Sequence, residues 1–140
     1  MVVVHGDLMT GRSVWAIVAG VLAVVIVTTL VDAVLHLAGM LPPTSQRMND
    51  AQSALALSYR IVIGVGGGYL TARLAPERPM KHAMILGVAG TLLGLIGVVA
   101  TWNLDLGPHW YPIAVAALAI PQCWAGGVIV ERRLDRGVIT

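Results

Sequence analysis

The sequence predicts an all-α fold: a four-helix antiparallel transmembrane bundle with both termini in the cytoplasm. The chain has 140 residues, of which 57% are hydrophobic and only 11% charged, whereas soluble domains carry roughly 25% charged residues. A chain this small has too much surface to hide such an apolar excess inside a globule, so lipid must cover it. We therefore expect one integral membrane domain over residues 1–140, with four apolar runs crossing the bilayer.

The first two expected spans cover residues 13–38 and 50–75, because a spanning helix needs about 20 mostly apolar residues. The first is longer than the apolar run of a signal peptide, about 7–15 residues, so we expect it to be retained. It ends before the pair Pro42-Pro43. The second follows Asn49, a residue type that caps helix N-termini.

The other two expected spans cover residues 80–102 and 109–130. A proline-bounded turn at residues 76–79 separates the second span from the third, and Gly107-Pro108 opens the fourth. Glycine and proline mark chain reversals in this way because they favour turns over continued helix. The spans therefore form two helical hairpins.

The orientation follows from the positions of lysine and arginine. One end of the spans carries seven basic residues, whereas the loops at the other end carry only Arg47. Cytoplasmic loops are enriched in lysine and arginine, so this end should face the cytoplasm. The seven are Arg12, Arg73, Arg78, Lys81, Arg132, Arg133 and Arg136.

Small residues indicate how the spans pack, because close backbone contact replaces the hydrophobic drive between helices in lipid. In the third span they recur at steps of three and four, which keeps them on one face. These are Gly87, Gly90, Gly94, Gly97 and Thr101. The second span has a matching stripe of Ala56, Arg60, Gly64, Gly68 and Thr71. Its "GVGGGYL" run lies inside a span and is therefore interpreted as a packing groove, not as a dinucleotide loop.

Two opposite charges are expected inside the membrane at similar depth. Thr28, Asp32 and His36 line one face of the first span, with Asp32 roughly 12 Å below its outer end. Arg60 lies about as deep in the second span. An unpaired charge near mid-bilayer costs about 2.5–3.5 kcal/mol. We therefore predict an ion pair between Asp32 and Arg60, with His36 bound to the same carboxylate.

Other polar and aromatic residues should gather near this pair on its outer side. Tyr59 is adjacent to Arg60, Asn103 follows the third span, and "PHWYP" opens the fourth. His109, Trp110 and Tyr111 of that motif are expected to roof a shallow pocket that faces outward.

The sequence leaves the role of the pair open. A buried ion pair can fix the register of two helices, whereas ionisable residues in membranes also mark binding sites and proton pathways. Asp32, His36 and His109 have suitable types for metal ligands, but their spacing matches no metal motif, and we expect no metal. We also expect no cofactor and no enzymatic activity, because catalytic motifs are lacking. The net charge of +2 gives no footprint for nucleic acid.

The stretch from Tyr59 to Gly90, with "LVDAVLH" before it and "GPHWYP" after it, resembles a group of small bacterial four-span membrane proteins whose function is uncharacterised. The resemblance implies a four-helix fold in the bacterial cytoplasmic (inner) membrane and implies no activity. Small multidrug-resistance exporters are also similar, with four short spans and an acidic residue in the first. However, a cation exporter should not pair its acidic residue with an arginine, so Arg60 separates this chain from that family.

The expected function is that of a non-enzymatic accessory, structural or assembly component of the membrane. Its partners would be the lipid bilayer and either other membrane proteins or further copies of the chain, which the glycine faces could join. The alternative is a small carrier or ligand-binding protein with Asp32, His36 and Arg60 as its polar core. A third option is a membrane enzyme that uses the outer cluster.

Overall fold

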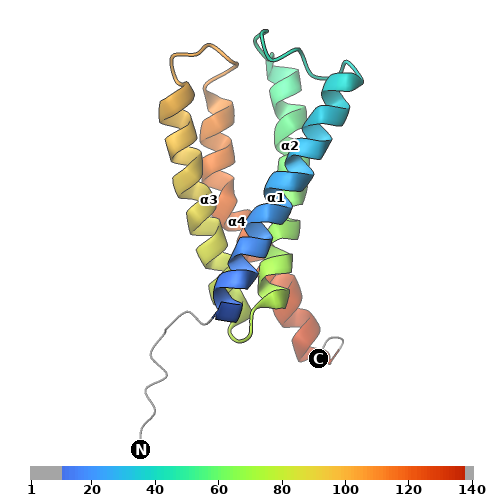
Figure 1. Cartoon of the computed structure of the whole chain (residues 1–140), viewed down its shortest axis with the longest axis vertical. Coiled ribbons are helices and arrows are strands. Elements are labelled where there is room, and N and C mark those ends of the chain that lie inside the picture. The colour runs from blue at the N-terminus through green and yellow to red at the C-terminus, as the bar shows by residue number, and fades with distance from the viewer. Residues whose placement is uncertain (1–10, 138–140) are drawn as a thin grey trace, which may run out of the picture.

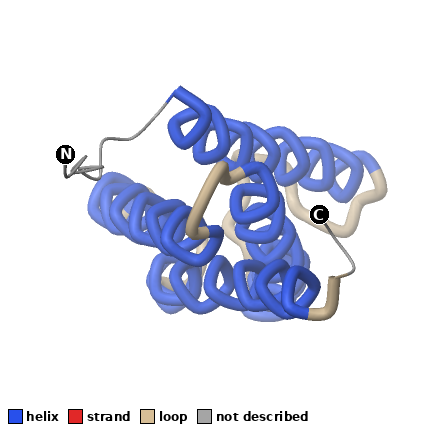
Figure 2. The backbone as a smooth tube through the Cα atoms, turned by 90° about the horizontal axis from the view of Figure 1, so that it is seen from below, coloured by secondary structure: helices blue, strands red, loops and turns tan. Residues whose placement is uncertain are grey.

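The computed structural model describes residues 11–137, and these form four α-helices. They are α1 (Gly11–Leu37), α2 (Asp50–Leu74), α3 (Pro79–Thr101) and α4 (Trp110–Asp135). Helices and loops account for the whole described chain, which contains no strand (Figure 2). Each helix is long and apolar enough to cross a membrane. The prediction of an all-helical chain with four helices able to span a membrane is therefore confirmed for the described residues.

The helix bounds follow the expected spans to within two residues, except at the end of α4. This helix continues to Asp135, five residues beyond the expected position, and includes Arg132 and Arg133 in its last turn. Basic side chains near a helix C-terminus interact favourably with the helix dipole, so the charges that end the apolar run do not end the helix.

Local sequence explains the starts of α2 and α3. The Asn49 side chain accepts a hydrogen bond from the Gln52 backbone N–H at 2.8 Å, and the Gln52 side chain accepts one from the Asn49 N–H at 3.0 Å. This reciprocal capping box satisfies two backbone donors that a helix N-terminus leaves free. The helix α3 begins with Pro79, whose missing N–H is harmless in the first turn.

The four helices form two hairpins that diverge toward one end. In Figure 1, the α1–α2 and α3–α4 loops lie at the top, and the α2–α3 loop lies at the bottom with the start of α1 and the end of α4. The helix α4 packs extensively against α3 and α2. Among the described residues, α1 packs against α2 and over a shorter stretch against α3, but not against α4. The arrangement is therefore not a symmetric four-helix square.

The backbones of α2 and α4 are in direct contact at glycine. A Cβ atom added at Gly68 would lie 2.6 Å from the Cα atom of Cys123, and one added at Gly126 would lie 2.7 Å from the carbonyl carbon of Gly68. Gly64, one turn away, is covered by the Gln122 side chain. Such close approach is the way in which small residues join helices in lipid.

The glycine face of α3 also meets α4. A Cβ atom at Gly87 would lie 3.0 Å from the Ile120 Cα atom, and one at Gly94 would lie 2.8 Å from the Ala116 Cβ atom. The stripes of α2 and α3 are therefore joined through α4, whose own small-residue face the sequence analysis overlooked. That face comprises Ala116, Ala119, Cys123, Gly126 and Gly127, and Gly90 of α3 contacts it at Ala119.

One predicted packing residue is in a different place. No atom beyond the nearby backbone of its own helix lies within 4 Å of a Cβ atom built at Gly97. The prediction that Gly97 packs against a neighbouring helix is therefore wrong. It lies where the hairpins diverge, and its lack of a side chain leaves space instead of closing a contact.

The helix α1 is attached mainly through its first half. Its buried residues are Ser13, Ala16 and Gly20. The Thr71 hydroxyl of α2 is fully buried and donates a hydrogen bond to the Ala16 carbonyl at 3.2 Å. Toward its other end, α1 contributes the Asp32 side chain to the site described next.

Candidate functional site

The expected ion pair between Asp32 and Arg60 is present. Arg60 Nη2 donates to Asp32 Oδ2 at 2.7 Å, and the Tyr59 hydroxyl donates to Asp32 Oδ1. The side chains of Arg60 and Asp32 are 31% and 27% exposed. Both oxygens of the carboxylate are therefore engaged, one by a cation and one by a phenol, and the cluster joins α1 to α2 in the half where the hairpins diverge.

Arg60 extends beyond this pair. Its guanidinium lies 5.9 Å from the centre of the Tyr59 ring, a distance suited to a cation–π contact. Its Nε atom is buried, and no hydrogen-bond acceptor reaches it from the described residues. Arginine is a donor only, so this N–H can be satisfied only by an acceptor. Arg60 thus uses Nη2 for the ion pair, while its Nε–H remains a donor without an acceptor among the residues described.

The prediction that His36 binds the Asp32 carboxylate is wrong. His36 is exposed, and its Nδ1 donates to the backbone carbonyl of Asp32 at 2.6 Å. In a helix, a side chain four residues after Asp32 lies close to both the backbone carbonyl and the carboxylate of Asp32. The four-residue spacing of Asp32 and His36 therefore fits either acceptor. His36 therefore does not belong to the polar core.

Asp32, His36 and His109 do not form a metal site. Within residues 11–137, no group of three or more His, Cys, Asp or Glu side chains is placed to hold a metal ion. His109 instead stacks on Trp102, with ring centres 4.2 Å apart and an interplanar angle of 9°.

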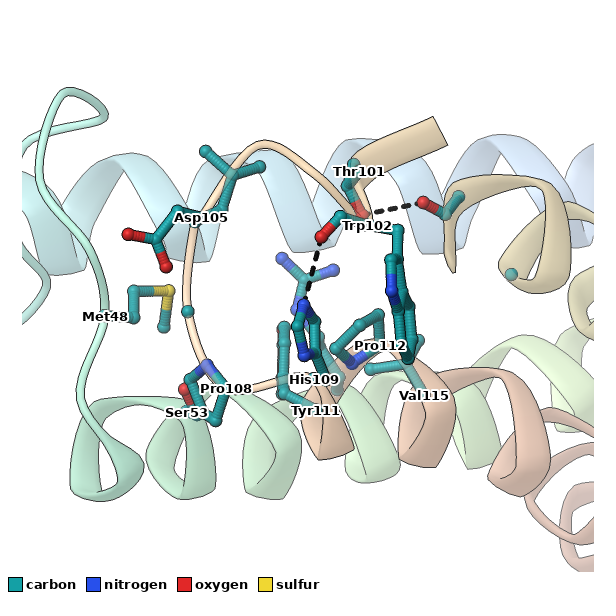
Figure 3. Close-up of a pocket in the computed structure, with 15 residues that line it drawn as sticks. Met48, Ser53, Thr101, Trp102, Asp105, Pro108, His109, Tyr111, Pro112 and Val115 are labelled. Atoms are coloured by element: carbon teal, nitrogen blue, oxygen red, sulfur yellow. Dashed lines mark hydrogen bonds between the residues drawn. The ribbon is translucent and has the colours of Figure 1, made fainter. Parts of the chain in front are cut away.

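A cavity of about 340 Å³ lies between the diverging hairpins, on the side of Arg60 that faces α3 and α4. It begins beneath the α3–α4 loop and extends between α2, α3 and α4 (Figure 3). Most of its lining is apolar. The lining residues are Met48, Ser53, Arg60, Gly94, Gly97, Thr101, Trp102, Asp105, Leu106, Gly107, Pro108, His109, Tyr111, Pro112 and Val115.

The two long loops meet at the rim of this cavity. The Met48 backbone N–H donates to the Leu106 carbonyl at 2.9 Å, and Arg47 Nη1 lies 2.5 Å from Asp105 Oδ1. Figure 3 shows Met48 and Asp105 on the same side of the pocket as Ser53 and Pro108. Because the side chains of Arg47 and Asp105 are largely exposed, their ion pair adds little stability.

The "PHWYP" motif only partly forms the roof that the sequence predicts. His109 and Tyr111 line the cavity, and His109 Nε2 donates to the Trp102 carbonyl at 3.0 Å. Trp110 does not line it, because its indole N–H donates to Asp50 Oδ1 at 2.7 Å. Asn103 is exposed in the loop and does not line the cavity either. The expected outer cluster is therefore divided: His109 and Tyr111 line the cavity, whereas Asn103, Trp110 and Tyr59, which binds Asp32, do not.

Sequence analysis missed Ser53, which is fully buried on the cavity wall. No partner for its hydroxyl is found in the described part of the chain. Ser53 lies three residues before Ala56, so it continues the stripe of α2 by about one helical turn. Extension of that stripe toward the outer end would have found it.

Loop residues that line the cavity, such as Leu106 and Gly107, carry no such pattern in the sequence. Comparisons with models of protein families, with curated proteins and with solved structures found no match for this chain.

Proposed function

We propose that the chain crosses the cytoplasmic membrane of a bacterium as an antiparallel bundle with both termini in the cytoplasm. The support is the distribution of basic residues. Seven lie in or beside the α2–α3 loop, the first turn of α1 and the last turns of α4, and only Arg47 lies near the other loops. The cavity would then face the outer half of the membrane. Fusions of a reporter that is active on one side only, placed in the loop at residues 75–78 and in that at 102–109, test this orientation.

We propose further that the protein binds a small molecule and catalyses no reaction. The observation that carries this proposal is the cavity itself: a mostly apolar space of about 340 Å³ with Arg60 and the fully buried Ser53 in its wall. Ligand pockets measure about 300–1,000 Å³ and combine apolar walls with a few placed polar groups. This favours the ligand-binding alternative over the accessory role.

The ion pair has a supporting part in this proposal. Asp32 holds one edge of the Arg60 guanidinium from α1, while α2 carries the arginine into the cavity wall. A fixed arginine loses less conformational entropy when it binds a ligand than a mobile one does. Asp32 is therefore proposed as a positioning residue, and Arg60 as the contact residue.

Filling the cavity tests the proposal. Gly97 lines it, and a Cβ atom added there meets no neighbouring helix within 4 Å, so the side chain of Gly97→Leu begins in open space and extends into the cavity. Gly66 also has nothing within 4 Å but is exposed on α2, so Gly66→Leu is the matched control. Both variants and the parent protein would be purified from host membranes in mild detergent and extracted for mass spectrometry of bound small molecules.

We expect one compound to accompany the parent protein and Gly66→Leu and to be lost from Gly97→Leu. Equal retention by both variants would contradict binding in this cavity. Absence of any compound, together with stoichiometric recovery of another membrane protein, would favour the accessory role instead.

A further inference from the structure

Two polar groups in the cavity wall have no partner of their own. The Ser53 hydroxyl and the Nε–H of Arg60 are both buried, and neither has a hydrogen-bond partner within residues 11–137. Both belong to residues that line the cavity. A buried polar group without a partner is unfavourable, and such groups in native structures point to an additional binding partner. Since Arg60 only donates and serine also donates, a ligand that offers acceptors satisfies both.

Two other polar groups of the cavity wall are already occupied. The Thr101 hydroxyl donates to the Gly97 carbonyl at 2.7 Å, and the His109 ring donates to the Trp102 carbonyl. Ser53 and Arg60 are separated by seven residues of helix, which is about 10 Å along its axis. This spacing suits a ligand with one hydrogen-bond acceptor near each end, so that one acceptor reaches Ser53 and the other reaches Arg60. A ligand with a single polar head would reach only one of them.

The charges around the cavity exclude a strongly charged ligand. The positive charge of Arg60 is already opposed by Asp32, and at the rim Asp105 is paired with Arg47. An anion would add an uncompensated charge in a region of low dielectric constant, and a cation would meet Arg60 without a free carboxylate. Neutral molecules avoid both penalties.

We propose that the cavity takes a neutral, largely apolar molecule with carbonyl acceptors toward two of its ends, which Ser53 and the Nε–H of Arg60 bind. This inference rests on the ligand-binding function proposed above and names the chemical class of the ligand. A para-quinone has these properties, because its two carbonyl oxygens point in opposite directions from a flat apolar ring.

Three probes of similar size separate the possible chemistries. They are 2,3-dimethyl-1,4-naphthoquinone, which has two carbonyl acceptors, 2,3-dimethylnaphthalene, which has none, and 2-naphthoate, which is an anion. The two methyl groups of the quinone block thiol addition, so Cys123 does not react with it. Equilibrium dialysis against lipid nanodiscs with and without the protein measures binding above simple partitioning into lipid.

Two variants test the contacts. Ser53→Ala removes the hydroxyl, and Arg60→Lys keeps a positive charge for Asp32 but removes the planar Nε–H. We expect each to weaken quinone binding about threefold to tenfold, the usual effect of one lost hydrogen bond. Ser58→Ala is the matched control on the same helix, because the exposed Ser58 hydroxyl bonds only the Ala54 carbonyl. Thermal unfolding of each variant shows whether the fold is retained.

The inference requires protein-dependent binding of the quinone that exceeds binding of the hydrocarbon and the anion and falls in both variants but not in the control. Stronger binding of 2-naphthoate, or equal binding of the hydrocarbon, would overturn the ligand class while keeping a binding cavity. Absence of protein-dependent binding for all three would also overturn it. The function proposed above fails separately, by equal retention of the co-purified compound in Gly97→Leu and Gly66→Leu.

Discussion

Replacement of Gly68 by alanine tests the contact between α2 and α4. The added methyl carbon would lie 2.6 Å from the Cα atom of Cys123, whereas ordinary contact begins at 3.4 Å. The helices must therefore separate by about 0.8 Å, and a gap of this size forfeits about a quarter to a half of the dispersion energy of the atoms concerned. Overpacking of this kind costs about 1–3 kcal/mol. We expect Gly68→Ala to lower the free energy of unfolding by that amount.

The matched control is Gly66→Ala, two residues earlier on α2. Nothing lies within 4 Å of a Cβ atom at Gly66, so this change only gains the helix propensity of alanine, up to about 1 kcal/mol. Titration of the protein in mild detergent with sodium dodecyl sulfate, followed by circular dichroism, measures both variants. Identical transitions for the two variants would show that the backbones of α2 and α4 do not touch at Gly68, and would refute the packing described above.

Three further changes test the cluster, the attachment of α1 and the cap of α2. Asp32→Asn leaves Arg60 without its counterion, so we expect the same titration to show a loss of about 1–3 kcal/mol, less than for a fully buried pair. The reversed pair, Asp32→Arg with Arg60→Asp, should regain part of it, and no regain would contradict the pairing. Thr71→Val removes the hydroxyl that α2 donates to α1, at about 1 kcal/mol. Thr29→Val, at an exposed site bonded within its own helix, is the control, and an equal loss there would argue against that contact. Asn49→Ala should cost about 0.5–2 kcal/mol and speed hydrogen exchange in the first turn of α2; unchanged exchange would show that the cap contributes nothing.

Most of the correct predictions from the sequence, the four helices and the ion pair, follow from the apolar runs and the charges. Asp32 and Arg60 were found because a charge in lipid needs a partner, and only one was available at that depth. Helix periodicity, by contrast, places a side chain on a face without naming the atom that it contacts. His36 was therefore assigned to a carboxylate when it binds the backbone carbonyl of the same residue.

The pairing of the helices depends on surfaces that glycine alone does not mark. The face of α4 that contacts α2 and α3 contains alanine and Cys123 as well as glycine, and it packs as closely as a face of glycine alone. A search for glycine therefore missed the central position of α4. The sequence predicted a shallow outer pocket, and the extension of the cavity between α2, α3 and α4 was missed for a related reason. It results from the divergence of the two hairpins, and Gly97 lies beside an open space, although its spacing matches that of the packed glycines. Tertiary packing decides whether a glycine of α3 contacts α4 or borders the cavity, and helix periodicity does not.

The position of the charged pair has a consequence for the biogenesis of the protein. Asp32 and Arg60 belong to α1 and α2, which leave the ribosome before α3 and α4, so each can be neutralised before those two helices are synthesised. Two isolated charges would each oppose release from the translocon by about 2.5–3.5 kcal/mol. From His82 to Thr101 and from Trp110 to Val130, the later helices carry no Asp, Glu, Lys or Arg and present no such barrier. The N-terminal hairpin is thus equipped to enter the bilayer as a unit, and the C-terminal hairpin then follows into lipid on hydrophobicity alone.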